Sequence, residues 1–136
     1  MKDSSKGQTL VEVLLAVGVA TLVLIGLTGA VTVSLRNAQF ARNQALATKY
    51  AQEGIEKVRA YRDQNDWQSF TSNCESILDA ASLPSPFQLS LDCYLPGSSN
   101  DCSPSEDNCE VKVIVSWTGA RRTYQSELTT RLTKWK

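Results

Sequence analysis

The distribution of hydrophobic residues along the chain changes twice. Positions 13–35 carry no charge and are mostly aliphatic. In positions 36–62 the apolar residues recur at helical spacing, and from residue 87 onward they alternate with polar residues. Helical recurrence predicts a helix with one buried face, and alternation predicts half-buried strands. We therefore expect a long N-terminal helix followed by a small domain that contains a sheet.

The uncharged run at positions 13–35 has the length of a membrane-spanning helix. Its 23 residues would extend ~35 Å, enough for a hydrocarbon core of ~30 Å. The run exceeds the roughly 7–15 apolar residues of a secretory signal peptide. Thr28 and Ala30 loosely resemble a signal-peptidase site, so secretory cleavage is an alternative. Lys2 and Lys6 precede the run and favour a cytoplasmic N-terminus, with the rest of the chain outside.

The stretch 36–62 predicts an amphipathic helix that continues beyond the membrane. It contains no proline and one glycine. We expect its apolar stripe to be the surface against which the C-terminal domain packs. The tetrapeptide at 63–66, Asp-Gln-Asn-Asp, should end this helix. The expected stripe consists of Ala38, Ala41, Ala45, Ala47, Ala51, Ile55, Val58 and Tyr61.

Residues 63–136 predict a small head domain. A capping-box pattern at 72–75, Ser-Asn-Cys-Glu, predicts a short helix through Ala81. Three alternating runs predict an antiparallel β-meander laid across the helix stripe, which makes the fold class α+β. The predicted strands are Phe87–Leu95, Cys109–Trp117 and Tyr124–Leu132.

Four cysteines, Cys74, Cys93, Cys102 and Cys109, all lie on the extracytoplasmic side of the predicted membrane helix. There is no CxxC spacing and no histidine, which argues against zinc. A head of 74 residues has a thin core, so disulfides worth roughly 2–4 kcal/mol each are expected. We favour Cys74–Cys93 and Cys102–Cys109, with Cys93–Cys102 as the open alternative.

Composition and motifs argue against catalysis and nucleic-acid binding. Fourteen basic and fourteen acidic residues balance, so no global field attracts nucleic acid. No nucleophile stands with a base and no phosphate loop occurs, so neither an enzyme nor a cofactor is expected. The acidic residues near 92–107 match no calcium loop. We interpret Arg121 and Arg122 as solvated charge, and Trp67, Trp117 and Trp135 as core or domain-edge residues.

Glu12 is the one charged residue between Lys6 and Arg36. A carboxylate at mid-membrane costs about 2.5–3.5 kcal/mol on insertion scales, and less near the interface. Glu12 either stays at the headgroup level or requires a cationic partner. The surrounding sequence favours the second interpretation.

Residues 6–12, Lys-Gly-Gln-Thr-Leu-Val-Glu, followed directly by an apolar helix, closely resemble the N-terminus of type IV prepilins and type II secretion pseudopilins. The resemblance implies a leader, residues 1–7, that a prepilin peptidase removes after Gly7. Gln8 becomes the first mature residue, which this family usually methylates, and Glu12 is the family's glutamate at the fifth mature position. The family usually has Phe where this chain has Gln8, and an N-terminal Gln can cyclise instead of being methylated.

The resemblance also implies how the chain assembles. A new α-amino group ~4 Å from Glu12 would gain about 4 kcal/mol at an effective dielectric near 20. From a neighbouring subunit, that amine would set the axial stagger between helices; a pair between Gln8 and Glu12 of one chain is the alternative. Residues 8–35 would form the filament core. Small residues that permit close helix packing are Ala16, Ala20, Gly26 and Ala30.

We therefore expect a pilin-like structural subunit, a minor pilin or a pseudopilin. Its partners would be other subunits, prepilin peptidase, the membrane platform for filament assembly and the lipid bilayer. It would reside in the cytoplasmic membrane with its head outside, then in a cell-surface or periplasmic filament. Alternatives are a single-pass anchored binding module and a competence pilin that assists DNA uptake. The motif is shared by pili, secretion pseudopili and uptake systems.

Overall fold

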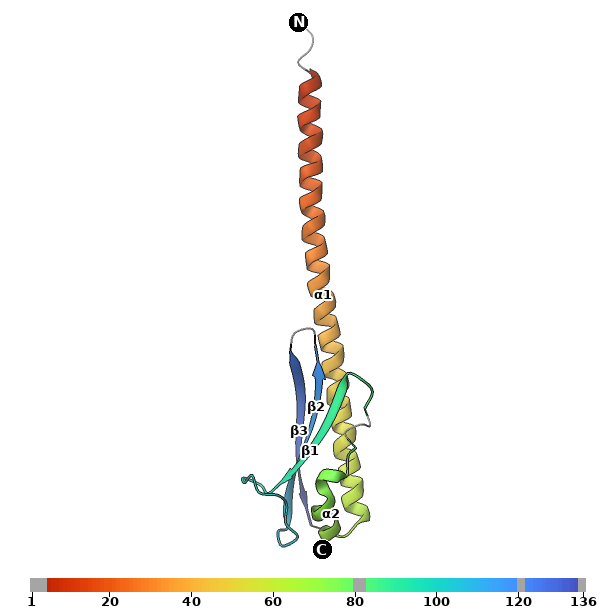
Figure 1. The fold of residues 1–136 in the computed structure, drawn as a ribbon, viewed down its shortest axis with the longest axis vertical. Coiled ribbons are helices and arrows are strands. Elements are labelled where there is room, and N and C mark those ends of the chain that lie inside the picture. Colours follow the sequence, from red (N-terminus) through yellow and green to blue (C-terminus); the bar gives the residue numbers. More distant parts are fainter. Residues whose placement is uncertain (1–4, 80–82, 120–121, 135–136) are drawn as a thin grey trace. The chain divides into compact units, whose positions relative to one another are not determined.

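The structure, a computed structural model, describes residues 5–79, 83–119 and 122–134, and for residues 5–8 the backbone only. The chain forms two compact units, residues 1–40 and residues 41–136, which we describe separately. Helix α1 (Ser5–Gln64) contributes to both units. The second unit adds a short helix, a 3-10 turn and three strands (Figure 1). The α+β fold class is thus confirmed.

In the first unit, all the residues that the structure describes belong to helix α1. Every side chain described there, from Thr9 to Phe40, is exposed. The helix is long and apolar enough to cross a membrane. The prediction of one membrane-length helix at the N-terminus is confirmed to that extent.

In the second unit, α1 contributes one face to the core. Ala47, Ala51, Ile55 and Val58 are buried, together with Gly54. These positions fall within about a third of a helical turn of one another at ~100° per residue. They are the part of the expected stripe that packs against the sheet, and Tyr61 packs partly buried against them.

The expected stripe was wrong at its N-terminal end. Ala38, Ala41 and Ala45 are exposed. Within the second unit, Ala45 points at least about 80° away from the buried positions when placed at ~100° per residue. Ala41 points only about 40° away from Ile55, but it lies six residues before Ala47, the first buried position. Their i,i+4 spacing is helical, but neither alanine lies on the part of the helix that the sheet covers.

The short helix of the head also starts at a different residue from the one predicted. Helix α2 (Trp67–Asn73) begins at Asp66, not at the capping box at 72–75. The Asp66 carboxylate accepts hydrogen bonds from the Ser69 backbone N–H (3.1 Å) and hydroxyl (2.7 Å). A 3-10 turn, η1 (Cys74–Ser76), follows. An earlier N-cap that buries Trp67 and Phe70 thus replaces the predicted start, and Ala81 lies outside the described residues.

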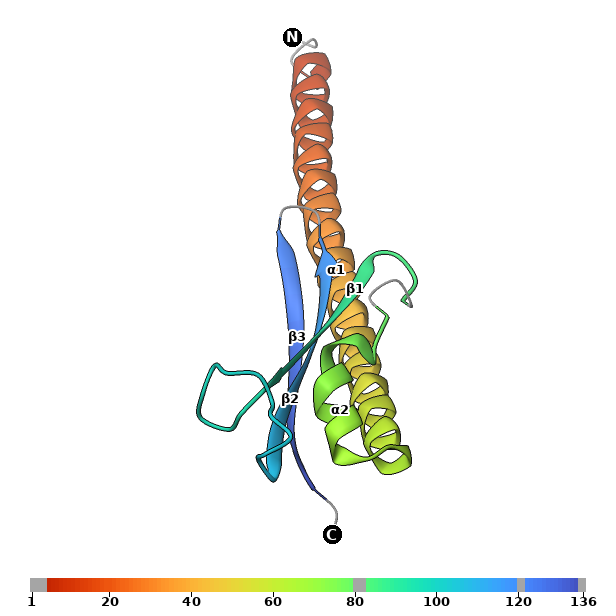
Figure 2. The ribbon, with the colours of Figure 1, turned by 60° about the horizontal axis from the view of Figure 1, so that its bottom comes forward.

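The three strands form the predicted antiparallel meander in the order β1-β2-β3 (Figure 2). They are β1 (Phe87–Tyr94), β2 (Asn108–Thr118) and β3 (Thr123–Thr133). Phe87 lies opposite Trp117 in the first ladder, and Val113 lies opposite Leu128 in the second. Burial alternates along all three strands, as predicted.

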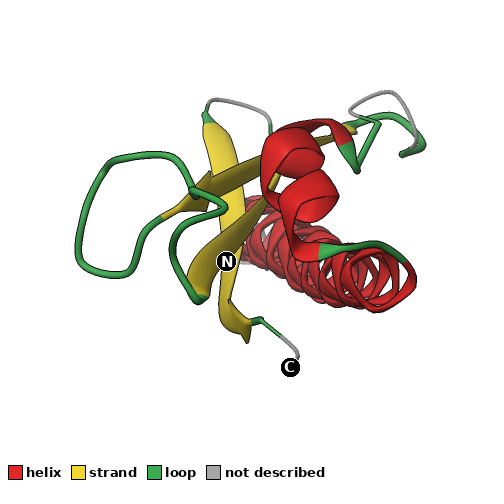
Figure 3. Cartoon of the chain, turned by 90° about the horizontal axis from the view of Figure 1, so that it is seen from below, coloured by secondary structure: helices red, strands yellow, loops and turns green. Residues whose placement is uncertain are grey.

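Helices α1 and α2 cover the same face of this sheet (Figure 3). The inward residues of the central strand, Val111, Val113 and Val115, are completely buried. At one end of the face, Phe87 packs against Tyr50 and Trp117, with ring centroids 5.3 and 6.2 Å apart. The opposite face carries polar side chains and ion pairs, which is the usual arrangement for an antiparallel sheet with one solvated face.

Candidate functional site

Helix α1 presents an unusually apolar surface in the first unit. Fifteen large aliphatic residues between Leu10 and Leu35 are each 55–70 % exposed. Such a surface is stable when lipid or other helices cover it, because exposed apolar patches of this size are rare on soluble proteins. This surface is the first part of the candidate site.

Glu12 lies on this surface, between the exposed residues Val11 and Val13. Among the described side chains it forms no hydrogen bond or ion pair. Gly7 and Gln8 lie in the first turns of α1, which begins at Ser5, and their side chains are outside the description. The proposed pairing of Glu12 with an amine therefore stays a prediction.

The small residues of the predicted packing surface share one side of the helix with Glu12. At ~100° per residue, Ala16, Ala20, Gly26 and Ala30 all fall within about 80° of Glu12. A Cβ placed on Gly26 would meet nothing within 4 Å, so this position is open to an approaching helix. The side of α1 that carries the carboxylate therefore also carries four small residues among its larger aliphatic ones.

The opposite side of the helix carries threonines whose hydroxyls are satisfied within the helix. Thr21 donates to the Gly18 carbonyl, Thr28 to Ile25 and Thr32 to Thr28, each at 2.8 Å. A hydroxyl bonded to its own helix can enter a bilayer without an unpaired polar group. These threonines are therefore compatible with contact to lipid, whereas the Glu12 carboxylate needs a partner.

The head is linked by two disulfides, Cys74–Cys93 and Cys102–Cys109, which is the pairing the sequence favoured. The first joins η1 to β1, and the second closes the loop before β2. Their Cα atoms are 6.2 and 5.5 Å apart. All four cysteines are thus paired.

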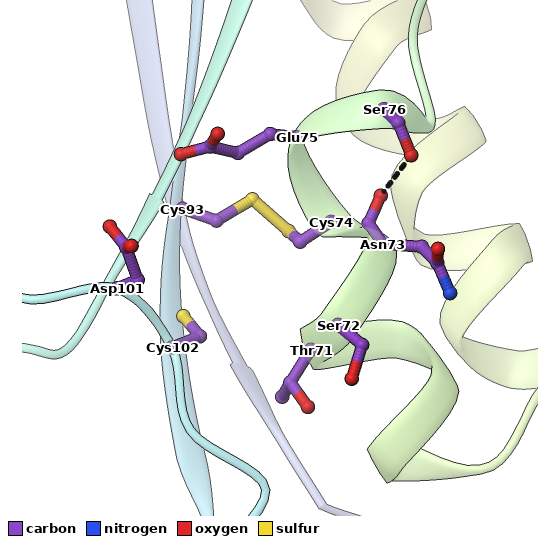
Figure 4. A pocket seen from close by; sticks show the side chains of 9 residues that line it. All are labelled: Thr71, Ser72, Asn73, Cys74, Glu75, Ser76, Cys93, Asp101 and Cys102. Atoms are coloured by element: carbon purple, nitrogen blue, oxygen red, sulfur yellow. Dashed lines mark hydrogen bonds between the residues drawn. A yellow bond between two sulfur atoms is a disulfide. The ribbon is translucent and has the colours of Figure 1, made fainter.

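A hollow of about 300 Å³ lies beside the first disulfide. Figure 4 shows the carboxylates of Glu75 and Asp101 near Cys93 in this hollow. An adjoining hollow of about 390 Å³ adds Asp92 and Tyr94. In the described part of the chain, no three side chains are grouped to hold a metal ion. The polar lining provides no nucleophile with a base.

The solvated face of the sheet is held by cross-strand ion pairs. Lys112 Nζ lies 2.9 Å from Glu127 Oε2, and Arg131 Nη2 lies 3.5 Å from Glu110 Oε2. The hydrogen bond from Lys112 to Glu127, and the charge of that carboxylate, raise the pKa of Lys112. These four charged side chains are paired with one another across the strands, so we do not consider them candidates for a functional site.

Two features of the head escaped sequence reasoning. The Trp67 indole N–H donates to the Glu106 carbonyl at 2.7 Å and so links α2 to the loop before β2. The only signal for α2 was an Asp three residues before a Ser, at 66 and 69, which also fits a helix end. Of the two arginines at the β2–β3 turn, Arg122 is exposed, and Arg121 and the predicted edge residue Trp135 lie outside the described residues.

Comparisons of the chain with protein-family models, with curated proteins and with solved structures find no match. The features of the chain that bear on its function are an apolar helix with one carboxylate and a disulfide-linked head.

Proposed function

We propose that this protein is a structural subunit of a type IV pilus-like filament, a minor pilin or a pseudopilin. It would be stored in the cytoplasmic membrane, cleaved after Gly7 by a prepilin peptidase, and assembled through its N-terminal helix. The observation that carries the proposal is Glu12, the one carboxylate on an otherwise apolar and exposed helix, five residues after Gly7. A passive membrane anchor has no need for this residue.

The energetics favour a partner that forms only after cleavage. The cost of a buried carboxylate, about 2.5–3.5 kcal/mol at mid-membrane, is offset when a cation lies near it. Two charges ~4 Å apart attract by about 4 kcal/mol at an effective dielectric near 20. The α-amine of Gln8 exists only in the cleaved protein, so processing would couple directly to assembly.

The small residues beside Glu12 support the same proposal. Ala16, Ala20, Gly26 and Ala30 would let a second helix approach closely on the side that carries the carboxylate. Close approach and a dry environment both strengthen the ion pair. The opposite side, with its internally bonded threonines, would remain suited to lipid.

The proposed topology places the head outside the cytoplasm. Lys2 and Lys6 favour this orientation only weakly, because Arg36 and Arg42 follow the apolar run on its other side. The two disulfides support the assignment more strongly, since such bonds persist in oxidising compartments.

Replacement of Glu12 tests the proposal directly. Glu12→Ala and Glu12→Gln should leave cleavage and membrane insertion intact but reduce incorporation into filaments at least tenfold, because the inter-subunit ion pair is lost. The measurement is the ratio of sheared filament protein to membrane-extracted protein. Thr9→Ala, an uncharged change one turn earlier in the helix, is the matched control and should assemble normally. Wild-type incorporation of both Glu12 variants would contradict the role of this residue.

A further inference from the structure

The position of the sheet along α1 identifies one end of the second unit. The Thr48 and Ser126 hydroxyls are 3.3 Å apart, and Arg59 Nη2 donates to the Thr130 hydroxyl at 3.2 Å. Strand β3 therefore runs in the same direction as α1. Its first residue, Thr123, lies at the end of the unit where the chain enters from residue 40.

The described segments nearest this end of the unit contain positive charge and no carboxylate. The segments concerned are 41–52, 84–88, 116–119 and 122–126, and they contain Arg42, Lys49 and Arg122 but no Asp or Glu. Lys49 is paired with Glu53 at 3.5 Å. Arg42 and Arg122 are exposed and form no ion pair within the described part of the chain.

Three exposed acidic residues lie at the other end of the sheet. Asp101, Glu106 and Asp107 are exposed in the loop between β1 and β2, and the Lys134 backbone N–H donates to the Asp107 carbonyl at 2.9 Å. This loop follows the end of β1 and so lies far from the β2–β3 turn, which begins after Thr118. Arg42 and Arg122, by contrast, lie at the end where the chain enters the unit from residue 40.

Along the chain, Arg42 is close enough to the apolar run to reach the surface of a membrane that this run would span. Arg42 follows Leu35, the last residue of the apolar run, by seven residues, or ~10 Å of helix. The headgroup layer extends about 5–8 Å beyond the hydrocarbon core on each side, and a long arginine side chain can reach back to it. Arg122 precedes Ser126 by four residues, ~13 Å of strand, which brings it to the same end of the unit as Arg42.

We propose that Arg42 and Arg122 bind the phosphates of anionic phospholipids in the leaflet from which α1 emerges. Guanidinium groups pair well with phosphate oxygens. The contact would hold the head against the bilayer before assembly, and it would be lost when the subunit leaves the membrane. This inference rests on the membrane-spanning part of the proposed function and is independent of cleavage or filament formation.

Hydrogen exchange on the full chain in nanodiscs, one copy per disc, tests this proposal. Discs of phosphatidylcholine alone are compared with discs that also contain phosphatidylglycerol. The amides at both ends of the β2–β3 turn, Trp117–Gly119 and Arg122–Tyr124, should exchange more slowly in the anionic discs. We expect a factor of about five for each arginine engaged, the effect typical of one basic residue at an anionic surface. High salt should abolish the difference.

Charge-matched variants separate a specific contact from general attraction. Arg42→Gln and Arg122→Gln should each reduce the protection, and the double variant should remove it. Lys57→Gln and Lys134→Gln, which remove the same charge elsewhere on the unit, should leave it unchanged. Equal exchange in both lipids, or equal losses in all four variants, would overturn the proposal.

Two further arms exclude other sources of protection. Inorganic phosphate added to the phosphatidylcholine discs should not protect the turn, and protection there would mean a phosphate site rather than a lipid contact. Protection that requires several copies per disc would mean contact with a second chain and would also overturn the proposal.

Membrane insertion of the protein is measured in parallel, as resistance to carbonate extraction. Failure of insertion would count against the membrane-spanning function itself, whereas an inserted chain without lipid-dependent protection would refute only this inference.

Discussion

Gly54 is a residue at which helix α1 packs tightly against the central strand. A Cβ at this position would lie 3.0 Å from Val113 Cγ1 and 3.3 Å from Leu78 Cδ1. Glycine in a helix interior costs up to about 1 kcal/mol relative to alanine. Its presence here is explained by the close packing of helix against sheet, which a side chain would prevent.

Gly54→Val should destabilise the head by about 1–3 kcal/mol, because the added methyl groups overpack a core that lacks room for them. The measurement is the free energy of unfolding from denaturant titration of the oxidised protein in detergent. Ala60→Val, an exposed position on the same helix, is the matched control and should cost less than about 1 kcal/mol, the propensity difference alone. Equal losses at the two positions would mean that the close packing at Gly54 contributes nothing.

Among the elements, α2 depends on a single side chain for its start. The Asp66 carboxylate accepts two hydrogen bonds from Ser69, one from the hydroxyl and one from the backbone, and these lower the pKa of Asp66 below its usual value of 3.8. A carboxyl group with a lower pKa in the folded state contributes stability above its unfolded pKa, and this contribution is lost as the pH falls through the folded pKa.

A comparison of wild-type protein with Asp66→Asn tests this capping as a function of pH. Asparagine can still cap the helix but does not titrate. The melting temperature of wild-type protein should exceed that of Asp66→Asn at neutral pH. The difference should begin to shrink below about pH 4, where Asp66 of the unfolded chain becomes protonated, and it should be lost as the pH falls through the lower pKa of the folded state. Asp66→Ala, which removes the cap, should melt lower than both at neutral pH. A gap between wild type and Asp66→Asn that does not depend on pH would contradict this account.

The two disulfides should differ in how much they contribute to the free energy of unfolding. Cys74–Cys93 closes a longer stretch of chain, 19 residues apart against 7 for Cys102–Cys109. The chain-entropy model then gives it the larger effect, by about 1 kcal/mol. Paired Cys→Ala variants of each bridge should show this order in denaturant titrations, and the reverse order would contradict it.

The strands were predictable because their signal is local. Alternation in 109–117 determines which face of β2 is buried, and the short turn near Gly119 forces an antiparallel return. The start of α2 was not predictable in the same way. Asp66 can end α1 or cap α2, and what decides is the burial of Trp67 and Phe70 against distant strands, which no local pattern contains.

The buried face of α1 was harder still to predict, because it too is decided by packing against distant strands. Alanines at 38, 41 and 45 continue a helical spacing, but alanine carries no information about which side will be buried. Larger residues, Ile55 and Val58, set the face that packs against the sheet. At the candidate site, the apolar run and Glu12 could both be identified from the sequence alone. The partner of Glu12 was not, because it would belong to another molecule and would arise only after cleavage.

At the scale of the whole molecule, the protein combines two units with different requirements. Residues 1–40 expose an apolar helix that needs lipid or other helices around it, and residues 41–136 enclose their own core. In our proposal the first unit exchanges lipid contacts for helix contacts during assembly, and the second stays folded throughout. Cleavage after Gly7 is the event that would commit the chain to this exchange.

The intact mass of the protein extracted from membranes of cells that contain a prepilin peptidase tests this central claim most directly. The account predicts loss of residues 1–7, a mature chain that begins at Gln8 with its amine free or methylated, and the mass deficit of two disulfides. A cyclised Gln8 would lack the amine that Glu12 needs and would contradict the pairing. A chain that retains its first seven residues, or one cut beyond Glu12, would contradict the account as a whole.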